Sequence, residues 1–204
     1  MKTLLSTILL LVTLTLNAQS PYQKAMIKGM ELISEDLQKA SQQFERIAAA
    51  EKENWVPAYY VALTNINSSW GQNGKEQTFN YMKKAQDYID QAEALSPDNV
   101  EIMVLQGMLN TCMIQYDSSV YGMKLSGPTT AIYEKALAMA PNNPRVVSNK
   151  AQWSMGLARF FNKPTQPYCD EIIRAIELFE KEEQNGFQPR WGMKQAQKSQ
   201  VECE

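Results

Sequence analysis

The sequence predicts an all-α protein, an antiparallel helix-pair solenoid of about four units. Apolar side chains recur at three- and four-residue steps, and no segment shows the two-residue alternation of a half-buried strand. Similar segments also repeat along the chain, which is typical of stacked repeat units. The three clearest copies begin at Phe44, Ile89 and Tyr133, 45 and 44 residues apart, and a weaker fourth begins near Phe179.

The first eighteen residues predict a signal peptide, which leaves residues 19–204 as one helical repeat domain. Lys2 precedes an uncharged, mostly apolar run from Leu4 to Leu16, and Ala18 offers a small residue for cleavage. The run is too short to span a bilayer, which takes about 20 residues. The alternative is a buried N-terminal helix. We therefore expect an exported protein without a membrane span after cleavage.

Within each unit, the predicted helices follow from apolar stripes and from the residues that interrupt them. Pro97 and Pro141 end helices, and Asn143 is placed to cap the next helix with Pro144 at its first position. A small residue follows at the same offset in each copy, namely Ala62, Gly107 and Ala151. The stripes are Leu37, Ala40, Phe44, Ile47 and Ala48; Phe79, Met82, Ala85, Ile89 and Ala92; and Ile172, Ala175, Ile176 and Phe179.

These positions resemble the tetratricopeptide repeat (TPR) family. Ala85, Ile89, Ala92 and Pro97 match its second-helix pattern, and Gly107 matches its first-helix signature. The repeats here are longer than the 34-residue family unit. The surplus is expected in loops between the helices of a unit, at residues 71–76, 117–128 and 162–167.

The chain is also similar to uncharacterised secreted repeat proteins of Gram-negative bacteria. The similar positions are Asn143-Pro144-Arg145 and Pro189-Arg190-Trp191-Gly192. This resemblance implies a periplasmic or secreted protein, and it implies a fold rather than a reaction.

Composition excludes several functions. The formal net charge is −2, with 20 Lys and Arg against 22 Asp and Glu, which argues against a nucleic-acid binder. Histidine is absent, so no imidazole can act as a base or a metal ligand. The segment Gly71–Lys75 lacks the spacing of a phosphate-binding loop. We expect no enzyme, no catalytic residue, no cofactor and no metal site.

Aromatic residues gather on two of the predicted first helices, Trp55, Tyr59, Tyr60 and Trp70 on one and Trp153, Phe160 and Phe161 on the other. The family resemblance implies that first helices line a concave groove. The alternative is that these side chains pack between helices. The partner-binding candidates are Tyr59, Leu63, Ile66, Val104, Met108 and Gln152, within a wider set that adds Val56, Asn67, Glu101, Thr111, Cys112, Arg145, Ser148 and Met155.

The leading functional hypothesis is a non-enzymatic interaction scaffold or adaptor of the cell envelope, which binds an apolar or aromatic protein segment in its groove. The alternative is a small-ligand binder or enzyme that uses the long loops 71–76 and 117–128. The oligomeric state stays open.

The three cysteines are assigned from helix geometry. Two C-terminal helices that turn near Phe187 would bring Cys169 and Cys203 to the same level, since each lies 16 to 18 residues from the turn. We hypothesise a disulfide between them, with Cys112 a free buried thiol. The alternative is three unpaired cysteines.

Overall fold

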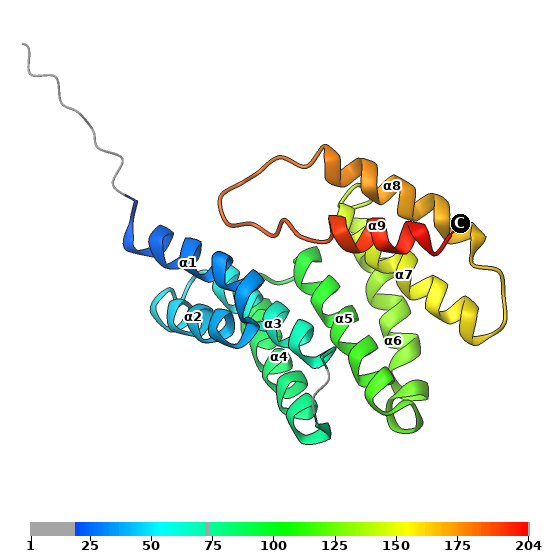
Figure 1. Ribbon diagram of the computed structural model, residues 1–204, viewed down its shortest axis with the longest axis horizontal. Coiled ribbons are helices and arrows are strands. Elements are labelled where there is room, and N and C mark those ends of the chain that lie inside the picture. Colours follow the sequence, from blue (N-terminus) through cyan, green and yellow to red (C-terminus); the bar gives the residue numbers. More distant parts are fainter. Residues whose placement is uncertain (1–18, 72–73, 204) are drawn as a thin grey trace, which may run out of the picture.

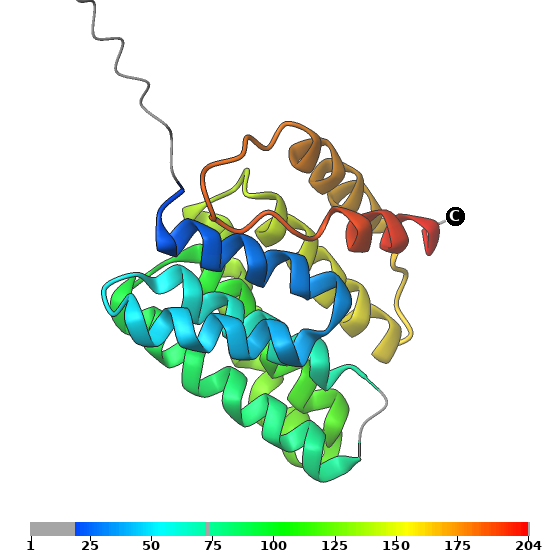
Figure 2. The same ribbon diagram turned by 60° about the vertical axis from the view of Figure 1, so that its left-hand side comes forward.

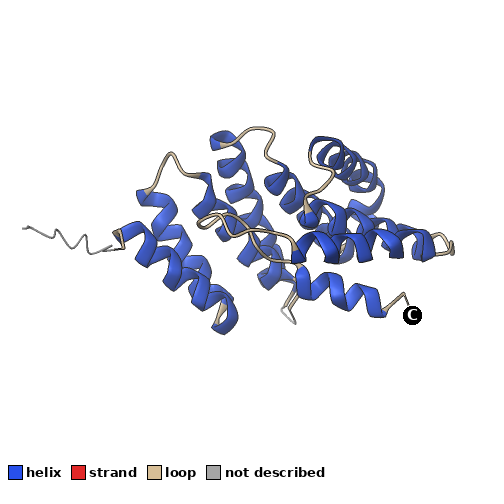
Figure 3. Ribbon diagram, turned by 90° about the horizontal axis from the view of Figure 1, so that it is seen from above, coloured by secondary structure: helices blue, strands red, loops and turns tan. Residues whose placement is uncertain are grey.

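The computed structural model describes residues 19–71 and 74–203, so the predicted signal peptide lies outside the described residues. The described part consists of helices and loops without a strand, which confirms the all-α prediction (Figure 3). The helices are α1 (Pro21–Glu35), α2 (Leu37–Ala50), α3 (Trp55–Ser69), α4 (Lys75–Leu95), α5 (Val100–Tyr116), α6 (Ser118–Met139), α7 (Pro144–Phe160), the 3-10 turn η1 (Gln166–Tyr168), α8 (Cys169–Glu180) and α9 (Met193–Val201).

Asparagine caps begin three helices at matching positions of the sequence. Asn54, Asn99 and Asn143 each accept a hydrogen bond from a backbone N–H in the first turn of α3, α5 and α7. Pro144 occupies the first position of α7, where a missing N–H costs nothing. The predicted cap at Asn143 is thus confirmed. Helices that start alike at nearly equal intervals can lie side by side in the same orientation.

The helices α3, α5 and α7 do lie next to one another, with α4 and α6 packed along them (Figure 1). Twelve of the fifteen residues of α3 are buried, which places this helix at the centre of the molecule. The hairpin α1–α2 covers one end of the row, and α8 and α9 cover the other.

The core divides into two clusters of buried side chains. The larger runs from α1 to the first turn of α7 around Met26, Phe44, Tyr59 and Leu105. The smaller joins α7 to α8 through Met155 and Ile172, and the partly buried Cys203 packs against it. The C-terminal helices therefore have their own small core beside the main one.

The segment that connects α8 to α9, residues 181–192, crosses back to the first helices (Figure 2). The Nε1 of Trp191 donates a hydrogen bond to the Tyr59 hydroxyl at 2.7 Å, and Phe187 meets the ring of Tyr22 edge-on at 5.6 Å between centroids. Both residues pack against the larger core cluster. This connecting segment thus covers α3 at the end near α1.

The predicted loop at 117–128 is wrong, because α6 begins at Ser118 and continues through Pro128. Asp117 does not break the chain but caps α6, accepting hydrogen bonds from the N–H groups of Ser119 and Val120. Pro128 removes one backbone donor from the helix interior. The prediction of a loop treated Asp117 and Pro128 as residues that break a helix, whereas Asp117 begins α6 and Pro128 lies within it.

Two smaller expectations also need correction. Residues Lys75 and Glu76 belong to α4 rather than to the predicted loop 71–76, since Gly74 is the N-cap of that helix. Phe79 is 44% exposed instead of being part of the buried stripe, and its ring lies 6.5 Å from that of Tyr116. The remaining members of that stripe, from Met82 to Ala92, are buried as predicted.

Candidate functional site

An open groove of about 1220 Å³ is bounded by residues of α3, α5, α6, α7 and α9. Its lining is mainly uncharged, with side chains that present flat or polarisable surfaces. The aromatic lining residues are Trp70, Tyr133, Trp153, Phe160 and Phe161, and the thioethers are Met108, Met123 and Met155.

Helical periodicity explains how two of the walls are built. Residues Gln152, Met155 and Arg159 lie three and four positions apart on α7, so they project from one face. Gln195, Lys198 and Glu202 have the same spacing on α9 and in the residue that follows it. These two faces meet at 2.7 Å between Arg159 Nη2 and Glu202 Oε2. The groove therefore has a polar wall made by α7 and α9.

Tyr133 contributes a phenol hydroxyl to the groove lining. Its side chain is 2% exposed and its ring lies against Gly107 of α5. The hydroxyl makes no hydrogen bond to any residue that the structure describes. Burial raises the pKa of Tyr133 well above its usual value, so the phenol keeps its proton. An unpaired donor beside the groove is a group that a ligand can satisfy.

Several of the groove-lining residues are large, apolar and exposed. Met123 is 99% exposed, Phe160 77% and Phe161 60%. The rings of Phe160 and Phe161 meet edge-on at 5.0 Å, and the ammonium group of Lys163 lies 5.9 Å from the Phe161 ring centroid. Large apolar side chains gathered in one place on a protein surface are typical of an interaction site.

The structure separates the predicted partner-binding residues into two groups. Met108 and Gln152 line the groove, together with Asn67, Thr111 and Met155 of the wider set. Four others, Tyr59, Leu63, Ile66 and Val104, are at most 4% exposed and belong to the larger core cluster. Their assignment to an open surface is wrong. Next to α3, the position of the expected groove is taken by the connecting segment 181–192, which bonds to Tyr59.

Two further candidates of the wider set, Glu101 and Arg145, form a buried ion cluster. Arg145 Nε lies 2.7 Å from Glu101 Oε2, and its other nitrogens bond the carboxylate of Glu182. Burial alone would lower the pKa of Arg145, but the hydrogen bonds to Glu182 and Glu101 outweigh it and raise the pKa. The cluster ties the connecting segment to α5 and α7 through Glu182. Its role is structural, since every partner is satisfied within the fold.

Cys169 and Cys203 form the predicted disulfide, with their Cα atoms 5.9 Å apart. The predicted helical hairpin that turns near Phe187 is wrong, because α8 ends at Glu180 and the connecting segment 181–192 separates it from α9. The bond joins the first residue of α8 to the chain just after α9. Cys112 is the free, buried thiol. The disulfide fixes the end of the groove wall that α9 supplies, because Glu202 is the neighbour of Cys203.

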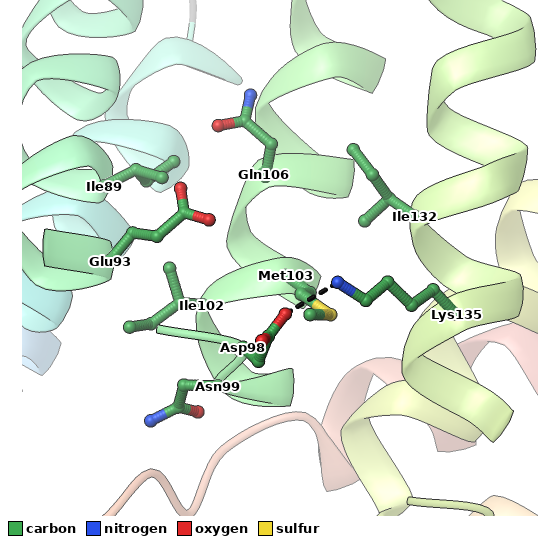
Figure 4. Close-up of a pocket in the computed structure, with 9 residues that line it drawn as sticks. All are labelled: Ile89, Glu93, Asp98, Asn99, Ile102, Met103, Gln106, Ile132 and Lys135. Carbon is green, nitrogen blue, oxygen red and sulfur yellow. Dashed lines mark hydrogen bonds and ion pairs between the residues drawn. The ribbon is translucent and has the colours of Figure 1, made fainter. Parts of the chain in front are cut away.

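A second, smaller cavity of about 250 Å³ lies between α4, α5 and α6 (Figure 4). Lys135 reaches across it to Asp98 at 2.6 Å, with Glu93 and Gln106 on the facing helices. Both members of this ion pair are more than half exposed. The cavity is small, and its cation, Lys135, is already paired with Asp98.

Among residues 19–71 and 74–203, no cluster of three or more carboxylate or thiol side chains could hold a metal ion. The helices of this part are also too short or too polar to cross a bilayer.

Comparisons with known proteins identify a fold but not a family. No family model matches the sequence, and no curated protein matches it. Among solved structures, the HusA haemophore from Porphyromonas gingivalis is similar, with a TM-score of 0.79. The alignment covers 92% of this chain and 94% of that chain at 21% sequence identity. At that identity the likeness establishes the all-helical fold over nearly the whole chain.

Proposed function

We propose that this protein is a non-enzymatic binding protein that carries a flat, largely apolar ligand of the porphyrin class, haem included, in the groove between α3, α5, α6, α7 and α9. The groove is the observation that carries this proposal. Its volume of about 1220 Å³ exceeds that of most small-molecule sites, which are typically about 300–1,000 Å³, and leaves room for a large ligand. The similar fold of the HusA haemophore supports the same class of ligand.

The lining suits such a ligand. Trp153 and Phe160 offer ring faces and edges for stacking, and Met108 and Met155 offer polarisable thioethers. With no histidine in the chain, thioethers and the Tyr133 phenol are the groove side chains that could bind iron. The raised pKa of Tyr133 favours the thioethers in that role and leaves Tyr133 as a hydrogen-bond donor.

The architecture is proposed to be a divergent TPR-like solenoid. Its support is the recurrence of asparagine caps at Asn54, Asn99 and Asn143, with α3, α5 and α7 packed in sequence. Stacked repeats build an extended surface along equivalent helices, and the groove includes residues from each of these three helices.

Export from a Gram-negative bacterium, to the periplasm or the medium, is proposed for the protein's location. The signal-peptide pattern of residues 1–18 supports export. The Cys169–Cys203 disulfide supports it independently, since disulfides persist in oxidising compartments.

A protein segment with apolar or aromatic side chains is the second candidate occupant. The observation that favours it is the exposed rim, because Met123, Phe160 and Phe161 extend the apolar surface beyond the groove itself. The protein would then act as an envelope scaffold or adaptor. An enzyme that uses two long loops is not favoured, since residues 118–127 are helical.

Titration of the exported protein with haemin tests the proposal. Saturable binding at a fixed stoichiometry, with a shifted Soret band, supports a porphyrin site, and non-saturating absorbance would contradict it. Purification from the native envelope provides the second arm. Two results together would favour the protein segment instead. These are a protein that co-purifies stoichiometrically and is not displaced by haemin, and the absence of saturable haemin binding.

A further inference from the structure

The charges of the groove are gathered on one wall. Among its described lining residues the charged ones are Arg159, Lys198 and Glu202, two cations against one anion, and all three come from α7 and from α9 or the residue after it. The whole chain instead has a small excess of acidic residues. The opposite walls present Trp70, Met108 and other uncharged side chains. The groove is therefore uncharged on one side and weakly positive on the other.

Two cross-helix contacts define this polar wall. Gln195 Nε2 donates to Gln152 Oε1 at 3.1 Å. Two helical turns further along both helices, Arg159 Nη2 donates to Glu202 Oε2 at 2.7 Å. Both contacts join residues 43 positions apart, so α7 and α9 run in the same direction with matched faces. Lys198 lies between the two contacts along α9 and has no ion-pair partner in the described chain.

Space for a ligand group exists beside these cations. Gly156 lies on α7 between Gln152 and Arg159 and lines the groove. A Cβ atom placed at Gly156 would have no other atom within 4 Å, apart from its own helix backbone. The missing side chain leaves the approach to Arg159 and Lys198 open.

Arg159 is able to exchange its partner. Its side chain is 50% exposed and that of Glu202 48%, and exposed pairs of this kind contribute little to stability. A guanidinium group can bind a carboxylate through two parallel hydrogen bonds, and it can do so with a ligand as well as with Glu202. The wall itself is held in place because the disulfide at Cys203 anchors the chain next to Glu202.

We propose that Arg159 and Lys198 form an anion subsite that binds the carboxylate groups of the ligand, so that the cargo is a flat amphiphile with acidic groups along one edge. This inference rests on the proposed function and assigns the orientation of the ligand. The apolar body lies against the aromatic and methionine side chains, the acidic edge faces α7 and α9, and Glu202 is displaced from Arg159.

The test compares protoporphyrin IX with its dimethyl ester, which has the same ring and no carboxylate charge, by fluorescence titration of the exported protein. We expect the acid to bind about tenfold more tightly than the ester, as charge-assisted hydrogen bonds imply. Arg159→Gln and Lys198→Gln should each weaken binding of the acid and leave that of the ester unchanged. Glu202→Gln should strengthen binding of the acid, because it frees Arg159.

Lys84→Gln and Glu45→Gln are the matched controls, since Lys84 and Glu45 form a cross-helix pair at 3.0 Å away from the groove lining. These controls should leave both affinities unchanged. Equal binding of acid and ester, unaltered by Arg159→Gln and Lys198→Gln, overturns the anion subsite and leaves the porphyrin site standing. Absence of saturable binding of either compound overturns both.

Discussion

Gly107 of α5 lies against the phenol of Tyr133 on α6, so closely that a Cβ atom at residue 107 would lie 2.7 Å from the Tyr133 hydroxyl oxygen. The absence of a side chain at Gly107 is what lets α5 and α6 approach each other here. The small residue predicted from the repeat alignment therefore has a steric role. Its neighbour Tyr133 links this close contact to the groove that it lines.

Gly107→Leu should lower the free energy of unfolding by about 1–3 kcal/mol, because the added side chain overpacks the α5–α6 contact. Thermal melting checks this, with Gly127→Leu as the control, since a Cβ atom at Gly127 of α6 would meet open space. Equal melting midpoints for the two variants would contradict the steric role of Gly107.

Tyr133→Phe should leave stability unchanged or slightly higher, because the hydroxyl that it removes has no partner within the described fold. If the hydroxyl donates to the ligand, haemin binding should weaken about three- to tenfold. Tyr81→Phe, on α4 and outside the groove lining, is the control for affinity. A loss of stability without a loss of affinity would place Tyr133 in the core alone.

Gly156→Leu should block the groove without unfolding the protein. The new side chain would extend into open space from α7, beside Met155 and Arg159, and occupy part of the ligand volume. We expect a loss of haemin affinity of at least tenfold with an unchanged melting midpoint. Gly127→Leu again serves as the control and should bind haemin normally. Undiminished binding by Gly156→Leu would mean that the ligand lies elsewhere.

Reduction of the Cys169–Cys203 disulfide should destabilise the protein by about 3–4 kcal/mol, the chain-entropy cost of opening a 34-residue loop. It should also weaken ligand binding, since α9 supplies Gln195, Lys198 and Glu202 to the groove. The loss of stability is measured by comparing denaturant unfolding of Cys203→Ser with that of the wild type. Three thiols that react with an alkylating reagent in the native, unreduced protein would contradict the disulfide itself.

Alkaline pH should destabilise the protein through Cys112. Burial raises the pKa of its thiol from 9.0 to about 12, and a hydrogen bond from Ser69 only partly offsets this. The native state then keeps a proton that the unfolded chain loses, so stability falls as pH rises from about 9 to 12. Denaturant titrations of wild type and Cys112→Ala at several pH values should show a shallower decline in the variant. Identical pH dependence would mean that Cys112 ionises normally in the fold.

Local signals in the sequence account for most of the elements. Helical spacing of apolar residues, the cap at Asn143 and the small residue at Gly107 act over a few turns, so they can be identified without the fold. The pairing of Cys169 with Cys203 was predicted correctly, but from two long helices that turn near Phe187, whereas α8 and α9 are shorter and are joined by the connecting segment 181–192. The helical state of 118–127 was not predicted, because an aspartate such as Asp117 is as common in a turn as at the N-cap of a helix.

The groove was predicted only in part, because its position depends on what covers the neighbouring helices. Nothing near Tyr59 indicates that Trp191, 132 residues later, bonds to it and closes that surface. Arg159 and Lys198 were missed as well. A signal for them does exist, since Gln152 and Gln195 are separated by 43 residues, as are the oppositely charged Arg159 and Glu202.

The connecting segment 181–192 also determines the order in which the protein can fold. In a linear array of repeats each unit contacts only its neighbours, so units can form or fray one at a time. Here the core around Tyr59 and Tyr60 is completed by Gln188 and Trp191 from the end of the chain. A nascent or truncated chain that lacks these residues leaves both tyrosines uncovered and remains a substrate for chaperones and proteases. Once the last residues arrive, the two ends are joined, and the molecule should unfold as one cooperative unit.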